Sequence, residues 1–292
     1  MKAGAKLLIT GADGQLGQAL ARLLDEQFAV VRTNRSACDI TNPEQVREVV
    51  EDNDPDVVLH CAAWTDVDGC EQDPDTAYRV NGQATARLAD ICVKTGTRLV
   101  YFSTDFVFDG EKGEPYCEAD QPSPLNVYGR SKLEGEEAVR NANRDNAIVR
   151  VSWLYSARGR NFLSSMIQRA NNSRAGKSEP IRVVDDQFSS PTWVNEVARQ
   201  TAAILGNDLT GTIHAVAHGA CSRYDMVTRL FDELGAELQV ERCRAAEFPQ
   251  AAQRPAYSAL ANTRLQQAGI DIMRPWDTAL REFLNQTRAR VR

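Results

Sequence analysis

A glycine-rich turn near the start of the chain most constrains what it can fold into. Residues 6–10 form an apolar run that predicts a buried strand, and leucines at 16, 20, 23 and 24 share one face of the helix expected next. Between them stands Gly11-Ala12-Asp13-Gly14-Gln15-Leu16-Gly17. Glycines at such a turn let the backbone approach a pyrophosphate, which the N–H groups of the helix start attract. We predict a dinucleotide-phosphate loop here; an ordinary glycine-containing turn is the alternative.

Short apolar runs alternate with amphipathic segments through the first half of the chain. Strands are expected at 6–10, 29–33, 57–60, 98–103 and 147–151, and helices at about 42–52, 75–95 and 126–142. This alternation predicts an α/β fold with a Rossmann-type, doubly wound parallel sheet. After 151 the pattern loosens into short strands and helices. We therefore predict a dinucleotide-binding domain over 1–151 and a smaller C-terminal substrate-binding domain over 152–292, with elements near 181–206 returning to the first.

Charge and cysteine usage narrow the expected partners. The 292 residues include 34 Lys and Arg against 40 Asp and Glu, for a formal charge of −6, which argues against nucleic acid or an anionic membrane as the main partner. No run approaches the ~18 apolar residues of a membrane span. The seven cysteines form no Cys-x-x-Cys pair, and the three histidines lack zinc-site spacing. We expect a cytoplasmic protein with reduced thiols and no His/Cys metal centre.

The residues after the second expected strand bear on the choice of cofactor. A cofactor without a 2′-phosphate calls for an acidic side chain at this point, whereas a phosphorylated one calls for a cation. The chain has Arg32-Thr33-Asn34-Arg35, and the next carboxylate is Asp39. We predict NADPH in preference to NADH, with Arg35 on the 2′-phosphate. A solvated surface arginine is the alternative for Arg35, and NADH stays open.

Two further motifs supply groups for a carbonyl reduction. Tyr128 and Lys132 are four apart in an expected helix, so both can address one substrate. A nearby cation favours the phenolate and lowers the tyrosine pKa, which makes the phenol a better acid toward a carbonyl that accepts hydride. Thr104 follows the fourth expected strand, at the sheet edge where ligands lie in doubly wound folds, and can donate to the same substrate oxygen.

Together these motifs resemble the extended short-chain dehydrogenase/reductase superfamily and, within it, the dTDP-4-dehydrorhamnose reductase family. The resemblance runs through residues 14–17, 61–65, 103–110, 128–136, 150–155 and 254–260, and so covers essentially the whole chain. It implies reduction of the C4 carbonyl of a dTDP-4-keto-6-deoxysugar. Tyr128 would be the proton donor, Lys132 would lower its pKa and hold the nicotinamide ribose, and Thr104 would orient the carbonyl.

The resemblance also implies roles for other residues. The glycine loop, the residues after the second expected strand and the resemblance together predict that the cofactor is bound by Gly11, Asp13, Gly14, Gln15, Leu16, Gly17, Arg35, Asp39, Ile40, Ala62, Ala63, Thr65, Asn81, Tyr128 and Lys132. The sugar nucleotide would be bound by Thr104, Asp105, Tyr128, Trp153 and Arg254. For three of these residues a purely structural role is the alternative to ligand binding: Trp153 as a core residue, Asp39 as a helix cap and Asn81 as a helix-surface amide.

Two departures from the family's pattern matter. Phe106 stands where the family usually has tyrosine; a 4,6-dehydratase would need a glutamate there as base, so the phenylalanine argues against that activity. Some relatives hold Mg²⁺ at a dimer contact through acidic side chains, and at one such position this chain has Gln15. That substitution argues against a metal-bridged dimer, while Mg²⁺ itself and a homodimer stay open.

Three other activities stay open at this level. A 4-epimerase also uses a Tyr-x-x-x-Lys pair, although the blocks around Trp153 and Arg254 match the reductases better. A ketoreductase for another dTDP-4-keto-6-deoxysugar would carry the same motifs. A non-catalytic subunit resembling the regulatory subunit of methionine adenosyltransferase could retain Thr104, Tyr128 and Lys132 by descent, and turnover separates it from an enzyme.

Overall fold

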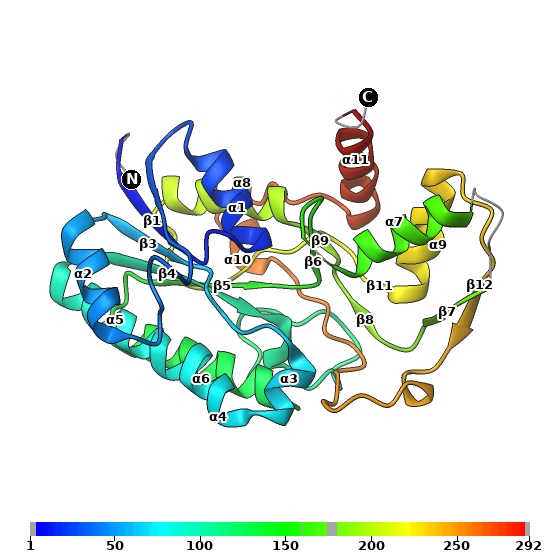
Figure 1. The fold of residues 1–292 in the computed structure, drawn as a ribbon, viewed down its shortest axis with the longest axis horizontal. Coiled ribbons are helices and arrows are strands. Elements are labelled where there is room, and N and C mark those ends of the chain that lie inside the picture. The colour runs from blue at the N-terminus through cyan, green and yellow to red at the C-terminus, as the bar shows by residue number, and fades with distance from the viewer. Residues whose placement is uncertain (1–3, 160, 174–179, 290–292) are drawn as a thin grey trace.

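Six parallel strands form the central sheet of the computed structural model, which describes residues 4–159, 161–173 and 180–289 (Figure 1). Their order is β10-β5-β4-β3-β1-β2. The strands are β1 (Lys6–Thr10), β2 (Ala29–Arg32), β3 (Val57–His60), β4 (Arg98–Thr104), β5 (Ala147–Val151) and β10 (Gly211–His214). Every pairing in the sheet is parallel, so the predicted α/β fold with a doubly wound sheet is confirmed.

The strand order reverses at β1, which pairs with β2 on one side and β3 on the other. Leu7 lies opposite Val30 of β2 and opposite Val57 of β3. The connections leaving β1 and β3 therefore diverge to opposite faces of the sheet, and the carboxyl ends of these two strands border a crevice. Ligands of open α/β sheets bind at such a point.

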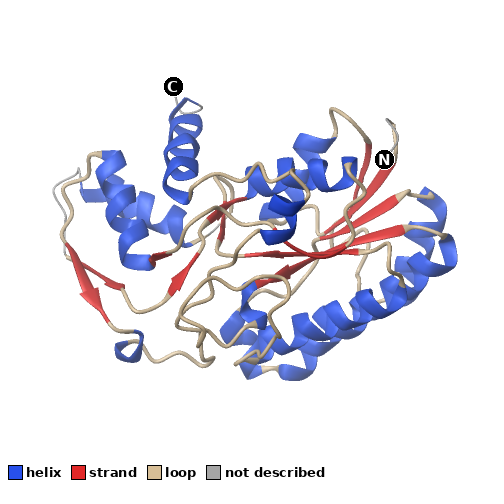
Figure 2. Cartoon of the chain, turned by 180° about the vertical axis from the view of Figure 1, so that it is seen from behind, coloured by secondary structure: helices blue, strands red, loops and turns tan. Residues whose placement is uncertain are grey.

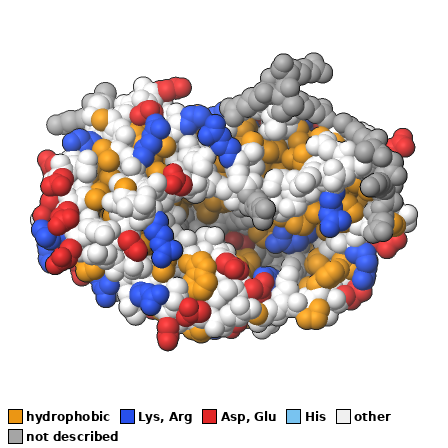
Figure 3. Space-filling model, in the orientation of Figure 1, with side chains coloured by type: hydrophobic (Ala, Val, Ile, Leu, Met, Phe, Trp, Pro, Cys, Tyr) orange, Lys and Arg blue, Asp and Glu red, His pale blue; other side chains and the backbone are white. Residues whose placement is uncertain are grey.

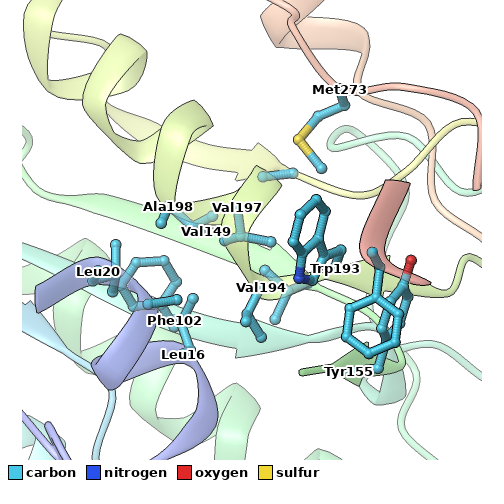
Figure 4. Close-up of a cluster of buried hydrophobic side chains, with 14 of the residues drawn as sticks. Leu16, Leu20, Phe102, Val149, Tyr155, Trp193, Val194, Val197, Ala198 and Met273 are labelled. Carbon is cyan, nitrogen blue, oxygen red and sulfur yellow. The ribbon is translucent and has the colours of Figure 1, made fainter. Parts of the chain in front are cut away.

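Helices cover both faces of the sheet, and the pleat of β1 shows why. Leu7 and Ile9 belong to the large apolar cluster under α1 (Gln15–Leu24) and α8 (Val194–Gly206), while Leu8 belongs to a second cluster on the opposite face. Figure 4 shows part of the first cluster, where Leu16 and Leu20 of α1 lie near Phe102 and Val197. The opposite face is covered by α2 (Pro43–Asn53), α5 (Ala84–Thr95) and α6 (Val127–Ala142) (Figure 1).

Side chains cap the starts of several helices. The Asn42 side chain caps α2 by accepting from the N–H groups of Glu44 and Gln45, as the Asn42-Pro43 pair suggests. The helix expected at 75–95 is confirmed as an unbroken helical run of α4 (Pro74–Ala77), the π-helical turn η1 (Tyr78–Gln83) and α5. The short helix α3 (Val67–Gln72), which the sequence pattern does not predict, precedes this run.

The chain beyond β5 builds a smaller layer beside the sheet and also returns to it. Three pairs of short strands carry it: β6 (Leu154–Tyr155) with β9 (Thr192–Trp193), β7 (Ile181–Val184) with β12 (Val240–Cys243), and β8 (Phe188–Ser189) with β11 (Cys221–Ser222). Its helices are α7 (Phe162–Ser173), α9 (Arg223–Leu234) and α11 (Trp276–Ala289), with α10 (Thr263–Gln267) beside β10. Figures 1 and 2 show α7, α9, β7 and β12 to one side of the central sheet. Meanwhile α8 packs on α1, and β10 extends the sheet.

A strap over residues 252–262 connects this layer to the sheet. Tyr116 and Leu260 form a bridge, and Gly110 meets Pro255 so closely that a Cβ at Gly110 would lie 2.6 Å from the proline Cβ. The face drawn in Figure 3 is hollowed where the two parts meet. No helix among the described residues is both long and apolar enough to cross a membrane.

Candidate functional site

Two adjoining cavities of about 400 and 450 Å³ lie along the carboxyl edge of the sheet. Both reach Gly11, Gly14, Cys61 and Ala63, so they meet at the crevice beside β1. The first is also lined by the predicted residues Gln15, Leu16, Gly17, Thr65, Thr104, Asp105, Tyr128, Lys132 and Trp153. The second is also lined by Asp13, Arg35, Asp39, Ile40 and Ala62. The structure therefore brings all the predicted site residues except Asn81 and Arg254 to these two walls.

The glycine loop has no room for side chains. Gly11 has a φ of +65°, and a Cβ there would lie 2.7 Å from the Ala62 Cα. At Gly17 a Cβ would lie 2.3 Å from the Gly11 carbonyl oxygen. Gly14 is the N-cap of α1, and no side chain caps this helix. The loop thus leaves the first N–H groups of α1 open at the crevice, which suits a pyrophosphate.

The second cavity has cationic and amide groups at its rim. The Arg35 side chain is 91% exposed, with its Nε 3.9 Å from the Asp39 carboxylate. Hydrogen bonds from Thr41 lower the pKa of Asp39, and the Asn34 amide donates to Asp13 at 2.8 Å. The exposed contact between Arg35 and Asp39 is weak, so the Arg35 side chain is free to turn toward a phosphate group.

Asn81 lies behind the cavity wall. It is buried in η1, where its side chain accepts from the Trp64 N–H at 2.8 Å and donates to the Trp64 carbonyl and to Ser131 Oγ, each at 3.0 Å. These bonds join α6 to the loop that carries Ala63 and Thr65. The structure gives Asn81 a positioning part, and its direct contact with a cofactor stays a prediction.

Helix α6 presents Tyr128 and Lys132 one turn apart. Asn126 caps it by accepting from the Gly129 N–H, and a Cβ at Gly129 would lie 2.1 Å from the Phe106 carbonyl oxygen, so the helix start packs directly on the loop after β4. The Phe106 ring meets the Tyr128 ring edge-on at 5.9 Å. This packing holds the tyrosine beside Thr104.

Burial sets the protonation of the catalytic pair. It raises the pKa of Tyr128 above its usual value of 10, with a hydrogen bond to Thr104 acting in the opposite direction, so the hydroxyl keeps its proton as an acid must. Burial lowers the pKa of Lys132 to about 7, against the opposing charge of Glu136. The ammonium donates to the Phe102 carbonyl at 2.8 Å and lies 4.0 Å from the centre of the Tyr101 ring. Its expected lowering of the Tyr128 pKa stays a prediction.

Asp105 sits in a cage of hydroxyls. Ser189 Oγ donates to its carboxylate at 3.0 Å, Ser258 Oγ at 2.5 Å and Thr104 Oγ1 at 3.2 Å, and Ser152 bonds to Ser189. Burial raises the pKa of this carboxyl, which the hydroxyls partly offset. Ser152 and Ser258 lie in the segments 150–155 and 254–260 that carry the family resemblance, whereas no motif marks Ser189.

Arg254 forms an ion pair with the Asp68 carboxylate. Its Nη1 and Nη2 donate to the two oxygens of Asp68 at 2.9 and 2.6 Å, and this pair lowers the pKa of Asp68 to about 2. The pair ties the strap to α3. A substrate contact by Arg254 therefore stays a prediction.

Gln15 is likewise engaged within the chain. Its Oε1 accepts from Ser156 Oγ at 2.9 Å and from the Asn161 amide at 3.1 Å. In the part of the chain that the structure describes, no three His, Cys, Asp or Glu residues are grouped to hold a metal ion. Through its bonds to Ser156 and Asn161, the Gln15 amide joins the start of α1 to the segment before α7.

One cation beside Trp153, Arg223, is not predicted by the sequence pattern. Trp153 has a left-handed φ of +39° and lines the first cavity. The Arg223 guanidinium lies 4.3 Å from the centre of its ring. Nothing in the local sequence marks Arg223, because α9 approaches Trp153 only in the folded chain.

Comparison with known proteins places the chain in a family. Residues 5–289 match the family model described as the RmlD substrate binding domain. The chain belongs to the dTDP-4-dehydrorhamnose reductase family. It is 39% identical over 283 residues to the dTDP-4-dehydrorhamnose reductase of Mycobacterium tuberculosis (strain H37Rv), covering 94% of this chain and 91% of the relative.

Two other members of the family bear on the cofactor and the sugar. A dTDP-4-keto-6-deoxy-D-glucose reductase of Streptomyces niveus is 38% identical, covering 94% of each chain. The crystal structure of the Bacillus anthracis dTDP-4-dehydrorhamnose reductase in complex with NADP is 36% identical, with a TM-score of 0.93, covering 97% of this chain and 99% of that one. The resemblance stated from the motifs is thus confirmed over nearly the whole chain.

Proposed function

We propose that this protein reduces the C4 carbonyl of dTDP-4-dehydro-L-rhamnose to give dTDP-L-rhamnose, with NADPH as the reductant. The observation that carries the proposal is the placing of Thr104, Tyr128 and Lys132 on the wall of the cavity that continues into the glycine loop. An acid, a second donor and a cation then meet at one point of the crevice, which is what reduction of a carbonyl requires.

Each group has a separate task. When bound, NADPH supplies a hydride to the carbonyl carbon. The Tyr128 hydroxyl donates its proton to the carbonyl oxygen, and the Thr104 hydroxyl donates a hydrogen bond to the same oxygen as negative charge grows on it. Lys132 holds positive charge beneath the site and, by the resemblance, binds the nicotinamide ribose. The Lys132 side chain is only 2% exposed, so its ammonium is largely removed from water.

Two kinds of observation support NADPH as the cofactor: the groups that line the crevice, and a relative that binds NADP. The glycine loop and the open start of α1 offer backbone N–H groups to a pyrophosphate. Arg35 is exposed at the rim of the second cavity, where a 2′-phosphate would extend. The Bacillus anthracis relative in complex with NADP supports the same choice.

A related ketoreductase activity is the second candidate. The Streptomyces niveus relative is named for another 4-keto-6-deoxysugar and is nearly as similar to this chain as the rhamnose enzyme. The experiment is to supply each dTDP-4-keto sugar with NADPH and identify the product by NMR. Formation of dTDP-L-rhamnose supports the proposal, exclusive turnover of the other sugar supports the alternative, and no turnover of either overturns both.

We also propose that the protein forms a homodimer. Because Gln15 is engaged with Ser156 and Asn161, such a dimer would not depend on a metal held by this side chain. Light scattering of the purified protein, with and without Mg²⁺, tests it. A dimer mass that does not depend on Mg²⁺ is expected, and a monomer would contradict it.

A further inference from the structure

The Arg223 side chain is a cation beside Trp153, which lines the first cavity. It is the first residue of α9, and its guanidinium lies 4.3 Å from the centre of the Trp153 ring and 4.9 Å from that of Phe162. Within the described ranges, its guanidinium makes no ion pair with a carboxylate and no side-chain hydrogen bond. Stacking on aromatic rings holds its plane but leaves its N–H groups unused.

Other arginines of this region are paired. Arg254 makes two bonds to Asp68. Arg242 also stacks on an aromatic ring, 4.4 Å from the centre of Tyr224, but lies 3.4 Å from the Asp185 carboxylate on the outer surface. Arg223 thus differs from a comparable stacked arginine in lacking a contacting carboxylate.

The environment of Arg223 disfavours its positive charge. Burial lowers its pKa to about 10, and the charge of Arg254 adds to this effect, while the Asp105 carboxylate opposes it. The guanidinium stays protonated at neutral pH, since this value is well above 7. A partly buried cation without a contacting anion carries a desolvation penalty, and a bound anion would relieve that penalty.

The elements around Arg223 fix it relative to the reaction site. Ser222 and Asp225 form a capping box at the start of α9, which holds the backbone at Arg223. Ser222 belongs to β11, and β11 pairs with β8, whose Ser189 donates to Asp105. The guanidinium is therefore anchored to the same framework that holds Asp105 beside Thr104.

We propose that Arg223 binds the diphosphate of the nucleotide sugar. Trp153, on which Arg223 stacks, lines the same cavity as Thr104 and Tyr128. One nucleotide-sugar molecule could therefore place its diphosphate at Arg223 and its sugar carbonyl at Tyr128. The planar, forked guanidinium suits two phosphate oxygens. This inference rests on the proposed function, because it takes a dTDP-sugar as the occupant of the cavity.

The test compares three variants by calorimetric titration with dTDP, thymidine and NADPH. In Arg223→Met, we expect the Kd for dTDP and the KM for the dTDP-sugar to rise about 10- to 100-fold, as for the loss of a charge-assisted bond. The affinities for thymidine and NADPH and the value of kcat should change little. Arg223→Lys, which keeps the charge, should retain part of the affinity, and the outer-surface control Arg242→Met should match wild type.

Failure of this inference can be told from failure of the proposed function. If wild type turns over the dTDP-sugar but Arg223→Met binds dTDP equally well, the diphosphate role is wrong and the activity stands. If wild type binds no dTDP and reduces no dTDP-4-keto sugar, both are overturned. Should Arg223→Met fail to fold, Arg223→Gln gives the same comparison, and equal loss of thymidine and dTDP affinity would count against the proposal.

Discussion

Glu136 offers a sharp test because it is a fully buried carboxylate one turn beyond Lys132. It accepts from Arg150 Nε at 2.8 Å and Nη2 at 2.7 Å, and from Ser103 Oγ at 2.6 Å. Glu136 is 0% exposed and Arg150 is 2% exposed. The substitution Glu136→Gln removes the negative charge and leaves the Arg150 cation buried without it.

We expect Glu136→Gln to lower the free energy of unfolding by about 3–5 kcal/mol, the usual cost of removing one partner of a buried pair. The weaker contact from Arg140 adds little, because that arginine is 45% exposed. Urea unfolding measures the loss. Glu137→Gln makes the same change at the next position on an exposed face and should stay within about 0.5 kcal/mol of wild type.

Two results would refute this reasoning. One is a stability of Glu136→Gln equal to that of Glu137→Gln. The other concerns the double variant Glu136→Leu with Arg150→Met, which removes both charges and should recover much of the lost stability, since pairs replaced by apolar side chains are often neutral. A double variant less stable than Glu136→Gln would show that the charge of Arg150 is not the source of the penalty.

The same substitution shifts the pH dependence of activity. The pKa of Lys132 is about 7, lowered from 10.5, and Glu136 is what opposes a further fall. The ammonium is lost as pH rises through about 7, so kcat/KM should fall on this alkaline side. In Glu136→Gln the pKa of Lys132 drops, and the fall should move to lower pH. An unmoved profile would contradict the link between the two groups.

Three further predictions concern the cofactor loop, the cofactor's phosphate and the strap. Gly17→Ala should abolish NADPH binding in a fluorescence titration because its Cβ would lie 2.3 Å from a carbonyl oxygen, whereas Gly206→Ala, with nothing within 4 Å, should bind normally. Arg35→Ala should lower the ratio of kcat/KM for NADPH over NADH by about tenfold or more, and a wild type that already prefers NADH would show that Arg35 has no such role. The pKa of Asp68 is about 2 against the usual 3.8, so the stability from its pair with Arg254 is present above pH 4 and lost as pH falls toward 2; urea midpoints of Asp68→Asn should lack this dependence.

The sequence predicts those parts of the fold that depend on neighbours along the chain. The apolar runs mark the strands because the parallel sheet is covered on both faces, as Leu7 and Leu8 show by facing different clusters. The glycine spacing marks the loop beside β1, and the four-residue spacing brings Tyr128 and Lys132 to one cavity wall. These are local patterns with a direct geometric meaning.

Contacts between distant residues could not be predicted in this way. Asp105 accepts from Ser258, 153 positions later, and nothing near either residue announces the other. Arg254 is expected to bind substrate, yet it pairs with Asp68 of α3. The helix α3 is too short to show a clear hydrophobic period, so this pairing could not be predicted. The two-residue strand β11, which sets the place of Arg223, is likewise invisible to periodicity.

The central claim is that this chain reduces a dTDP-4-keto sugar with Tyr128 as the proton donor. The most direct measurement is NADPH oxidation with dTDP-4-dehydro-L-rhamnose by wild type and by Tyr128→Phe. Wild type should turn over, and Tyr128→Phe should be slower by about 10²- to 10⁴-fold in kcat with its NADPH affinity retained. Equal turnover by the two proteins, or none by wild type, would contradict the account.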